Sequence, residues 1–168
     1  IKDARNSIEE EKIGLDESGF ELLEYKTKDR TLDFLNSQLV INSYYDECAG
    51  IVKENTGASY VMPFDHNIRS ASGKKFKKKL SGGQEVQGPA HVVHGDYTLR
   101  SAPDRINQLS QRPTKNDTLS SVMDKDERLI SEALANEILA GRRYSIINLW
   151  RNIRSIPVET NPIALCNA

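Results

Sequence analysis

Two side chains that can bind a metal stand one residue apart in the triplet His94-Gly95-Asp96. Residues two apart in a β-strand point to the same face, so a strand here would present an imidazole and a carboxylate side by side. With a second histidine, such a pair forms the 2-His-1-carboxylate triad, which leaves room on Fe(II) for a 2-oxoacid and dioxygen. A histidine beside an aspartate is also often only a hydrogen-bonded pair, so the spacing leaves both interpretations open.

The other imidazoles do not complete this site in an obvious way. His91 lies three residues before His94 and would face the opposite side of a regular strand. His66 follows Asp65 at a predicted strand end, where the two could orient a metal ligand or form a helix cap or surface pair. No histidine follows His94 in the 168 residues.

The composition indicates one domain that works on a small or neutral partner. A chain of 168 residues with 38% apolar content can bury one core, so we expect residues 1–168 to form a single domain. A net charge of −1 provides no overall field for nucleic acid or a membrane surface. No apolar run approaches the roughly 20 residues that cross a bilayer, and the first residues lack the apolar segment of a signal peptide. These features predict a cytoplasmic protein, with Cys48 and Cys166 as reduced, buried thiols.

The apolar pattern predicts helices and strands in alternation, which indicates an α+β fold. Apolar residues at helical spacing predict a helix from Asp33 to Gly57, a second from Leu129 to Leu139 that ends at Gly141, and a short one over 103–111. Strand composition marks residues 58–64, 90–98, 144–151 and 161–166. Residues 70–88 carry five lysines among glycines and serines and predict a mobile, solvated basic loop, with no aromatic platform for nucleic acid beyond Phe76.

Four segments occur in an order that resembles a known enzyme family. They are residues 60–69, 88–98, 147–151 and 162–167, which read YVMPFDHNIR, GPAHVVHGDYT, INLWR and PIALCN. Together they resemble the CmcJ/AsaB-like hydroxylase and desaturase family, which includes the cephamycin methoxylation protein and fungal oxygenases that tailor natural products. The resemblance spans residues 58–168, and several ordered motifs are far more specific than one triplet.

The resemblance implies a double-stranded β-helix (jelly-roll, cupin-like) core with flanking helices. It also implies a non-haem Fe(II)- and 2-oxoglutarate-dependent oxygenase that hydroxylates or desaturates a small molecule. In this family His94 and Asp96 correspond to the first two iron ligands, and a histidine after the Ala164-Leu165-Cys166 segment is the third. That histidine is expected beyond Ala168, so the core would be incomplete at its C-terminus and the chain would be the N-terminal and central part of a longer catalytic domain. The alternative is a non-enzymatic small-molecule-binding module with a degenerate metal site.

Several polar residues in the matching segments are candidates for binding cofactor or substrate. A 2-oxoacid needs a cation for its distal carboxylate, and arginine binds carboxylates in bidentate fashion, although a structural ion pair is the common alternative. We expect cofactor contacts from Asn148, Arg151 and Arg105, and substrate contacts from Thr98, Arg69 and Trp150. The alternatives are a hydrogen-bonded core amide for Asn148 and core packing for Trp150. In a regular strand Asn148 and Arg151 would point to opposite faces and could not line one cavity.

The expected partners are a small-molecule substrate and dioxygen, not nucleic acid or a membrane, and a homodimer stays open. The sequence does not choose between hydroxylation and desaturation, and it does not identify the substrate.

Overall fold

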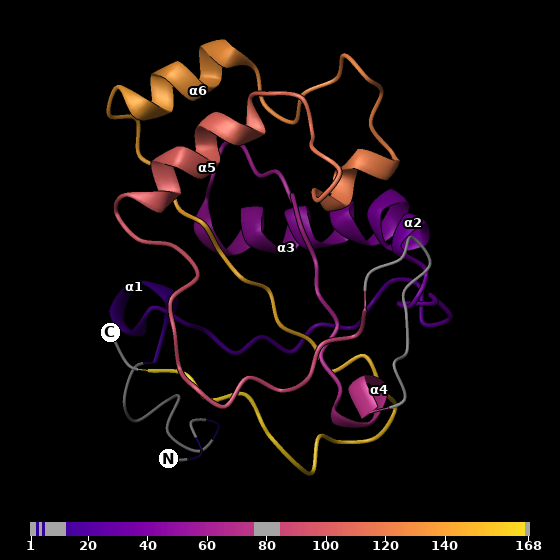
Figure 1. The fold of residues 1–168 in the computed structure, drawn as a ribbon. Helices are drawn as coiled ribbons and strands as arrows, with labels where there is room; N and C mark the ends of the chain where they lie inside the picture. The colour runs from indigo at the N-terminus through magenta and orange to yellow at the C-terminus, as the bar shows by residue number, and fades with distance from the viewer. Residues whose placement is uncertain (1–2, 4, 6–12, 76–84, 167–168) are drawn as a thin grey trace.

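The structure is a computed structural model that describes residues 3, 5, 13–75 and 85–166. Its elements are α1 (Leu15–Ser18), α2 (Ser37–Leu39), η2 (Val40–Tyr44), α3 (Tyr45–Thr56), α4 (Ala71–Lys75), α5 (Ser101–Leu109), η3 (Thr118–Ser121) and α6 (Glu132–Leu139). Figure 1 shows α5 and α6 together at one end of the molecule and α3 crossing its middle. Extended chain, with α1 and α4, occupies the other end.

The longest helical run joins α2, η2 and α3 without a break. The Asn36 side chain caps its start by accepting a hydrogen bond from Leu39 N at 3.2 Å. Gly57 ends it in the left-handed conformation, with a φ of 66° and its N–H bonded to Lys53 O. The predicted end of this helix is confirmed, whereas its start is at Ser37 and not at Asp33. The reason is local, because the Asp33 carboxylate accepts from Leu35 N and holds a turn there.

The first core cluster forms around the π-helical part of this run. Val40, Tyr44 and Tyr45 are buried there against Leu119 of η3. The Tyr44 ring meets Phe34 edge-on at 5.1 Å between ring centres. The wider π turn therefore lies where the two tyrosines pack into the core.

The second core cluster joins α5 to α6 through Ile106, Ile130 and Ala135. The predicted helices are both present, with α5 at 101–109 and α6 beginning at Glu132. Helix α6 starts later than Leu129 because the Ser131 hydroxyl caps it by accepting from Leu134 N at 3.1 Å. Gly141, with a φ of 117°, lies beyond its end as the sequence predicts.

The four predicted strands are not formed in the part of the chain that the structure describes. Residues 58–64, 90–98, 144–151 and 161–166 carry no strand there. A parallel bridge joins Arg69 and Gln87, with Ser70 N to Gln87 O at 2.8 Å and Gln87 N to Ile68 O at 2.9 Å. A strand is stable only when a neighbour accepts and donates its backbone hydrogen bonds, and these segments lack such a neighbour within the described ranges. The double-stranded β-helix stays a prediction.

Two further expectations are corrected. Cys48 is half-buried, but Cys166 is exposed, because it lies in the extended segment that ends the described chain. Of the predicted basic loop, residues 71–75 form α4 and Val86 is buried at 3% exposure, while residues 76–84 lie outside the described residues. Over the ranges described, we find no helix with the length and apolar character needed to cross a membrane.

Candidate metal centre

The His94 and Asp96 side chains converge as the sequence predicts. His94 Nε2 lies 3.5 Å from Asp96 Oδ1, and both side chains are about half exposed. Bonds of about 2.1 Å to a first-row metal ion place two neighbouring ligand atoms roughly 3.0 to 3.4 Å apart. The observed separation is close to that of two ligands on one ion, and solvent exposure gives an ion and a substrate access to the pair.

The protonation of His94 favours metal binding through Nε2. Its Nδ1 lies 2.8 Å from the carbonyl oxygen of Val92, and because a carbonyl only accepts, Nδ1 carries the proton. In the neutral ring Nε2 then has a lone pair, which faces the carboxylate of Asp96. Two acceptors that face each other need a cation or a proton between them. A backbone carbonyl that holds the second ring nitrogen is also the usual environment of a metal-binding histidine.

Asn148 completes the immediate surroundings of Asp96. Its Nδ2 donates to Asp96 Oδ2 at 2.6 Å, across 52 residues of sequence. The carboxylate thus has one oxygen bound by the amide and the other turned to His94. We call His94 and Asp96 the metal pair, after the role that the sequence predicts for them. Among the described residues predicted to bind cofactor or substrate, Asn148 is the one with a hydrogen bond to this pair.

The residues after Asp96 are fixed to the helical end of the molecule. Tyr97 packs edge-on against Phe64, with ring centres 6.4 Å apart. Thr98 and Ser101 cap α5 reciprocally, because Ser101 N donates to the Thr98 hydroxyl at 3.1 Å and Thr98 N donates to the Ser101 hydroxyl at 2.9 Å. Thr98, predicted to contact substrate, uses its hydroxyl for this cap.

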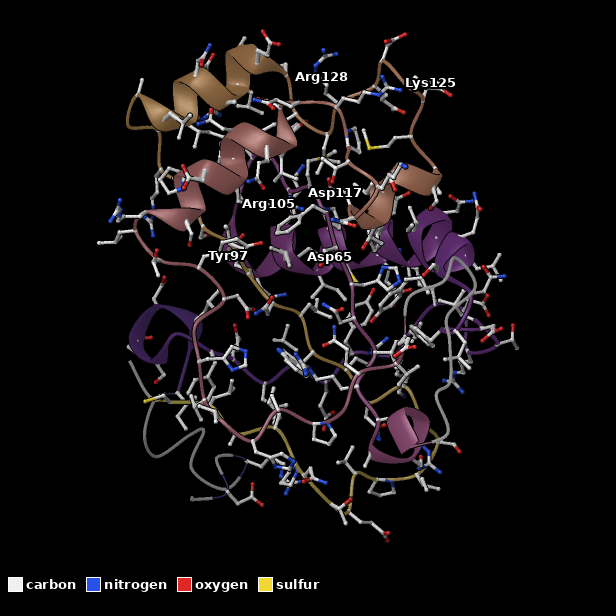
Figure 2. All side chains as sticks on the ribbon, in the orientation of Figure 1. Asp65, Tyr97, Arg105, Asp117, Lys125 and Arg128 are labelled. Carbon is white, nitrogen blue, oxygen red and sulfur yellow. The ribbon has the colours of Figure 1, made fainter. Side chains whose placement is uncertain are left out.

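Arg105, predicted to bind the cofactor, is instead part of an ion pair. Its Nη1 donates to Asp117 Oδ1 at 3.0 Å, and its guanidinium lies over the Phe64 ring at 5.1 Å; Figure 2 shows Arg105 and Asp117 next to each other. Partial burial raises the pKa of the Asp117 carboxyl, but hydrogen bonds from Thr114 and Arg105 outweigh it, so the pKa lies below the usual value. The adjoining cavity of about 20 Å³ has room for about one water molecule and not for 2-oxoglutarate.

Arg151, also predicted to bind the cofactor, is anchored to a buried carboxylate. Its Nη1 lies 3.6 Å from Oε1 of Glu47, whose side chain is 5% exposed, and it also donates to the Thr27 hydroxyl. Its Nη2 donates to Tyr25 O at 2.5 Å. The guanidinium lies 5.7 Å from the ring centres of Tyr25 and Tyr44. Asn148 and Arg151 therefore contact different parts of the molecule, as their spacing predicts.

The sequence interpretation missed Glu47 as the partner of Arg151. The signal was present, because Glu47 lies three residues after Tyr44 and four before Ile51, on the apolar stripe of its helix. A charged residue on such a stripe needs a buried partner of opposite charge.

The remaining candidates lie away from the metal pair's contacts. Arg69 donates to Gly88 O at 3.1 Å beside the parallel bridge, and Trp150 is 57% exposed. His66 lies between Tyr45, whose hydroxyl is 2.9 Å from Nδ1, and Ser37, whose hydroxyl is 3.2 Å from Nε2. Burial lowers the pKa of His66, and nearby Asp65 partly opposes this. His66 is therefore held between Ser37 and Tyr45 and not in a helix cap or a surface pair, and its role in orienting a metal ligand stays a prediction.

The Asp65 carboxylate is likewise bound by neighbouring residues. Its carboxylate accepts hydrogen bonds from the Thr118 hydroxyl and from His66 N. In the part of the chain that the structure describes, no group of three His, Cys, Asp or Glu residues is arranged to hold a metal ion. His94 and Asp96 thus lie together without a third such residue among the described ones, and their role as metal ligands stays a prediction.

Comparison with known proteins gives this pair a chemical context. A family described as "Oxidoreductase/YMDC permease-like domain" matches residues 1–168. An uncharacterized protein of the dcmA 3′ region in Methylophilus leisingeri is 40% identical over 88% of this chain and 69% of its own length. The hydroxylase/desaturase efuI of Hormonema carpetanum is 27% identical over 99% of the chain and 49% of its own length. The alpha-ketoglutarate-dependent dioxygenase tstK of Talaromyces stipitatus is 26% identical over 94% and 48%.

The chain thus spans about half the length of these two fungal relatives. No solved structure matches it.

Proposed function

The chain belongs to the oxidoreductase/YMDC permease-like domain family, and from this premise we propose that it is part of a non-haem Fe(II)- and 2-oxoglutarate-dependent oxygenase. The reaction proposed is hydroxylation or desaturation of a small natural-product molecule. The observation that carries the proposal is the His94–Asp96 pair, with Nε2 turned to a carboxylate and Nδ1 held by a carbonyl. The names of the relatives efuI and tstK support it. Membership of the CmcJ/AsaB-like group and a double-stranded β-helix core are part of the same proposal.

In this proposal His94 and Asp96 are two ligands of the iron. The third is a histidine from the part of the relatives' length that this chain does not span. When bound, Fe(II), with 2-oxoglutarate and dioxygen as co-substrates, would supply the oxidant that removes hydrogen from the substrate.

The residues of the chain itself bind and orient. The Val92 carbonyl keeps the proton of His94 on Nδ1, so that Nε2 stays available as a ligand. Asp96 supplies negative charge, and the half-exposed pair leaves a side open on which cofactor and substrate can approach. Arg105 and Arg151 already neutralise Asp117 and Glu47, so the carboxylate of 2-oxoglutarate is not assigned to either.

The proposal is tested by carbon dioxide release from 2-oxoglutarate labelled at carbon 1. The full-length protein is incubated with Fe(II), dioxygen and candidate small molecules, alongside the variants His94→Ala, Asp96→Ala and His91→Ala. His91 is exposed and outside the pair, so it serves as the matched histidine control. We expect release by the parent and by His91→Ala and none by the other two. Release that survives His94→Ala contradicts the proposal, and a folded parent that binds small molecules without release supports the binding-module alternative.

A further inference from the structure

Within the described ranges, the amide of Asn148 holds the Asp96 carboxylate from outside the pair, and the segment that carries this amide has an anchor of its own. Asn148 Nδ2 donates to Asp96 Oδ2 at 2.6 Å, whereas Oδ1 is the oxygen nearest to His94. Rotation of the carboxylate would exchange the two oxygens or turn both away from Nε2. The hydrogen bond from Asn148 opposes that rotation, because an ionised acceptor makes the bond shorter and stronger than a neutral one.

Asn148 in turn belongs to a segment without secondary structure, so something else must fix its position. Residues 144–153 are extended and unpaired as a strand in the described chain. Three residues after Asn148, at a reach of about 10 Å in extended chain, Arg151 bonds to the Tyr25 carbonyl and the Thr27 hydroxyl and pairs with Glu47.

The charges of this anchor are largely removed from water. Glu47 is 5% exposed and the Arg151 side chain 17%. The second oxygen of Glu47 accepts from Lys28 N at 3.0 Å, so the carboxylate also ties the segment before α2 to α3. Loss of either partner leaves a buried charge without compensation, which makes a displaced Arg151 unfavourable.

We propose that Asn148 is a positioning residue that sets the orientation of the Asp96 ligand, and that Arg151, through buried Glu47, holds Asn148 in place. The inference rests on the proposed function, because it treats Asp96 as a metal ligand. It assigns to Arg151 a role at the metal site that does not require contact with cofactor. It also makes the Tyr25–Lys28 segment and α3 part of the support of the site, although both are remote from it in sequence.

The test is titration of the full-length protein with Co(II), followed by visible absorption, which reports both affinity and the ligand field. Loss of an outer hydrogen-bond partner typically weakens metal binding about 10- to 100-fold. We expect Asn148→Ala to weaken Co(II) binding by at least about 10-fold and to shift its absorption bands. Asn152→Ala is the matched control, because the Asn152 amide donates to Ile156 O and not to the metal pair. We expect it to bind Co(II) as the parent does.

The anchor is tested by a double-mutant cycle. Arg151→Ala should weaken Co(II) binding in the same direction, and Asn148→Ala added to it should have little further effect, since the two act in one chain of contacts. If Arg151→Ala unfolds the protein, Thr27→Val takes its place in the cycle. This variant removes one hydroxyl acceptor from Arg151 and should weaken Co(II) binding by a smaller factor.

The outcomes separate the two proposals. Parent-like affinity and spectrum in Asn148→Ala overturn the positioning role while the metal site stands. Full additivity of Asn148→Ala with Arg151→Ala, or with Thr27→Val, overturns the link between them. A folded parent that binds no Co(II) overturns both this inference and the proposed function.

Discussion

The two ends of this molecule differ in how their backbone hydrogen bonds are formed. At the helical end, α5 and α6 form their hydrogen bonds within themselves and bury Ile106, Ile130 and Ala135 in a shared core. The other end, the extended end, is made mostly of chain outside the helices (Figure 1). In segments without helices, apolar side chains such as Val92, Trp150 and Ile156 stay exposed, and strand-like sequence carries no strand among the described residues. A helix needs only its own residues, whereas a strand needs a neighbour. His94 and Asp96 lie in a segment without helix or strand, so the geometry of the pair depends on side-chain anchors.

Side-chain contacts, which we call anchors, tie the segments without helices to the helical part of the molecule. Tyr97 packs on Phe64, Thr98 caps α5, and Arg151 pairs with Glu47 of α3. We therefore expect the free energy of unfolding to respond strongly to changes at the helical end and at these anchors, and weakly elsewhere.

The largest effect is expected at the anchor itself. Glu47→Ala leaves the charge of Arg151 largely buried and unpaired and should cost about 3 to 5 kcal/mol of unfolding free energy. The matched control is Glu54→Ala, since Glu54 is an exposed carboxylate on the same helix. Urea unfolding of both variants gives the comparison. Equal stability of the two variants would show that the Arg151–Glu47 contact does not tie the ends together.

A core substitution measures the difference between the ends directly. Ile106 is buried at 7% exposure between α5 and α6, and Ile106→Ala should cost about 2 to 4 kcal/mol through lost burial and the cavity left behind. Ile156→Ala removes the same atoms from a side chain that is 47% exposed and should change stability by less than about 0.5 kcal/mol. Both values come from the same unfolding curves. Similar losses would mean that the extended end is packed as tightly as the helical one.

Two glycines of one helix should respond in opposite directions. Gly57 has a φ of 66° with open space around it, so Gly57→Ala adds strain alone and should cost about 1 kcal/mol. Gly50 lies inside α3, also with open space, and Gly50→Ala should stabilise by about 0.5 to 1 kcal/mol through helix propensity. Thermal unfolding of the pair checks the difference. A loss at Gly50 would indicate that α3 is not a regular helix there.

The smallest effect expected is a pH dependence of the unfolding free energy that comes from His66. Burial lowers the pKa of His66 in the folded state, so the neutral ring is the form that folding favours. This contribution is fully present above the unfolded value near 6.5 and is lost as the pH falls through the lower folded pKa. We expect unfolding free energy to decline on acidification below about pH 6.5 and His66→Gln to reduce that slope. His91→Gln is the exposed control, and an unchanged slope in His66→Gln would contradict the assignment.

The sequence predicted what local physics determines. The helix that ends at Gly57 and the second helix, with Gly141 beyond its end, follow from helical spacing and terminal residues, and the structure confirms them. The starts at Ser37 and Glu132 were missed because Asp33 and Ser131 use their side chains on nearby backbone N–H groups. The convergence of His94 and Asp96 was also local, since two residues of extended chain suffice for it.

The rest of the site depends on contacts between distant segments. Asn148 reaches Asp96 across 52 residues and Arg151 reaches Thr27 across 124. Neither spacing nor residue type could distinguish an arginine that binds a cofactor from one that pairs with Glu47 or Asp117. The predicted strands are absent from the described residues for a related reason. Strand composition shows that a segment can form a strand, but it does not identify the neighbouring segment with which that strand would pair.

The central claim is that His94 and Asp96 hold iron for a 2-oxoacid. The most direct measurement is anaerobic titration of the full-length protein with Fe(II) and 2-oxoglutarate, recording the weak visible charge-transfer band of the chelate. We predict that the band forms in the parent and in His91→Ala and is lost in His94→Ala and Asp96→Ala. A band that persists in His94→Ala, or no band in a folded parent, would contradict the claim.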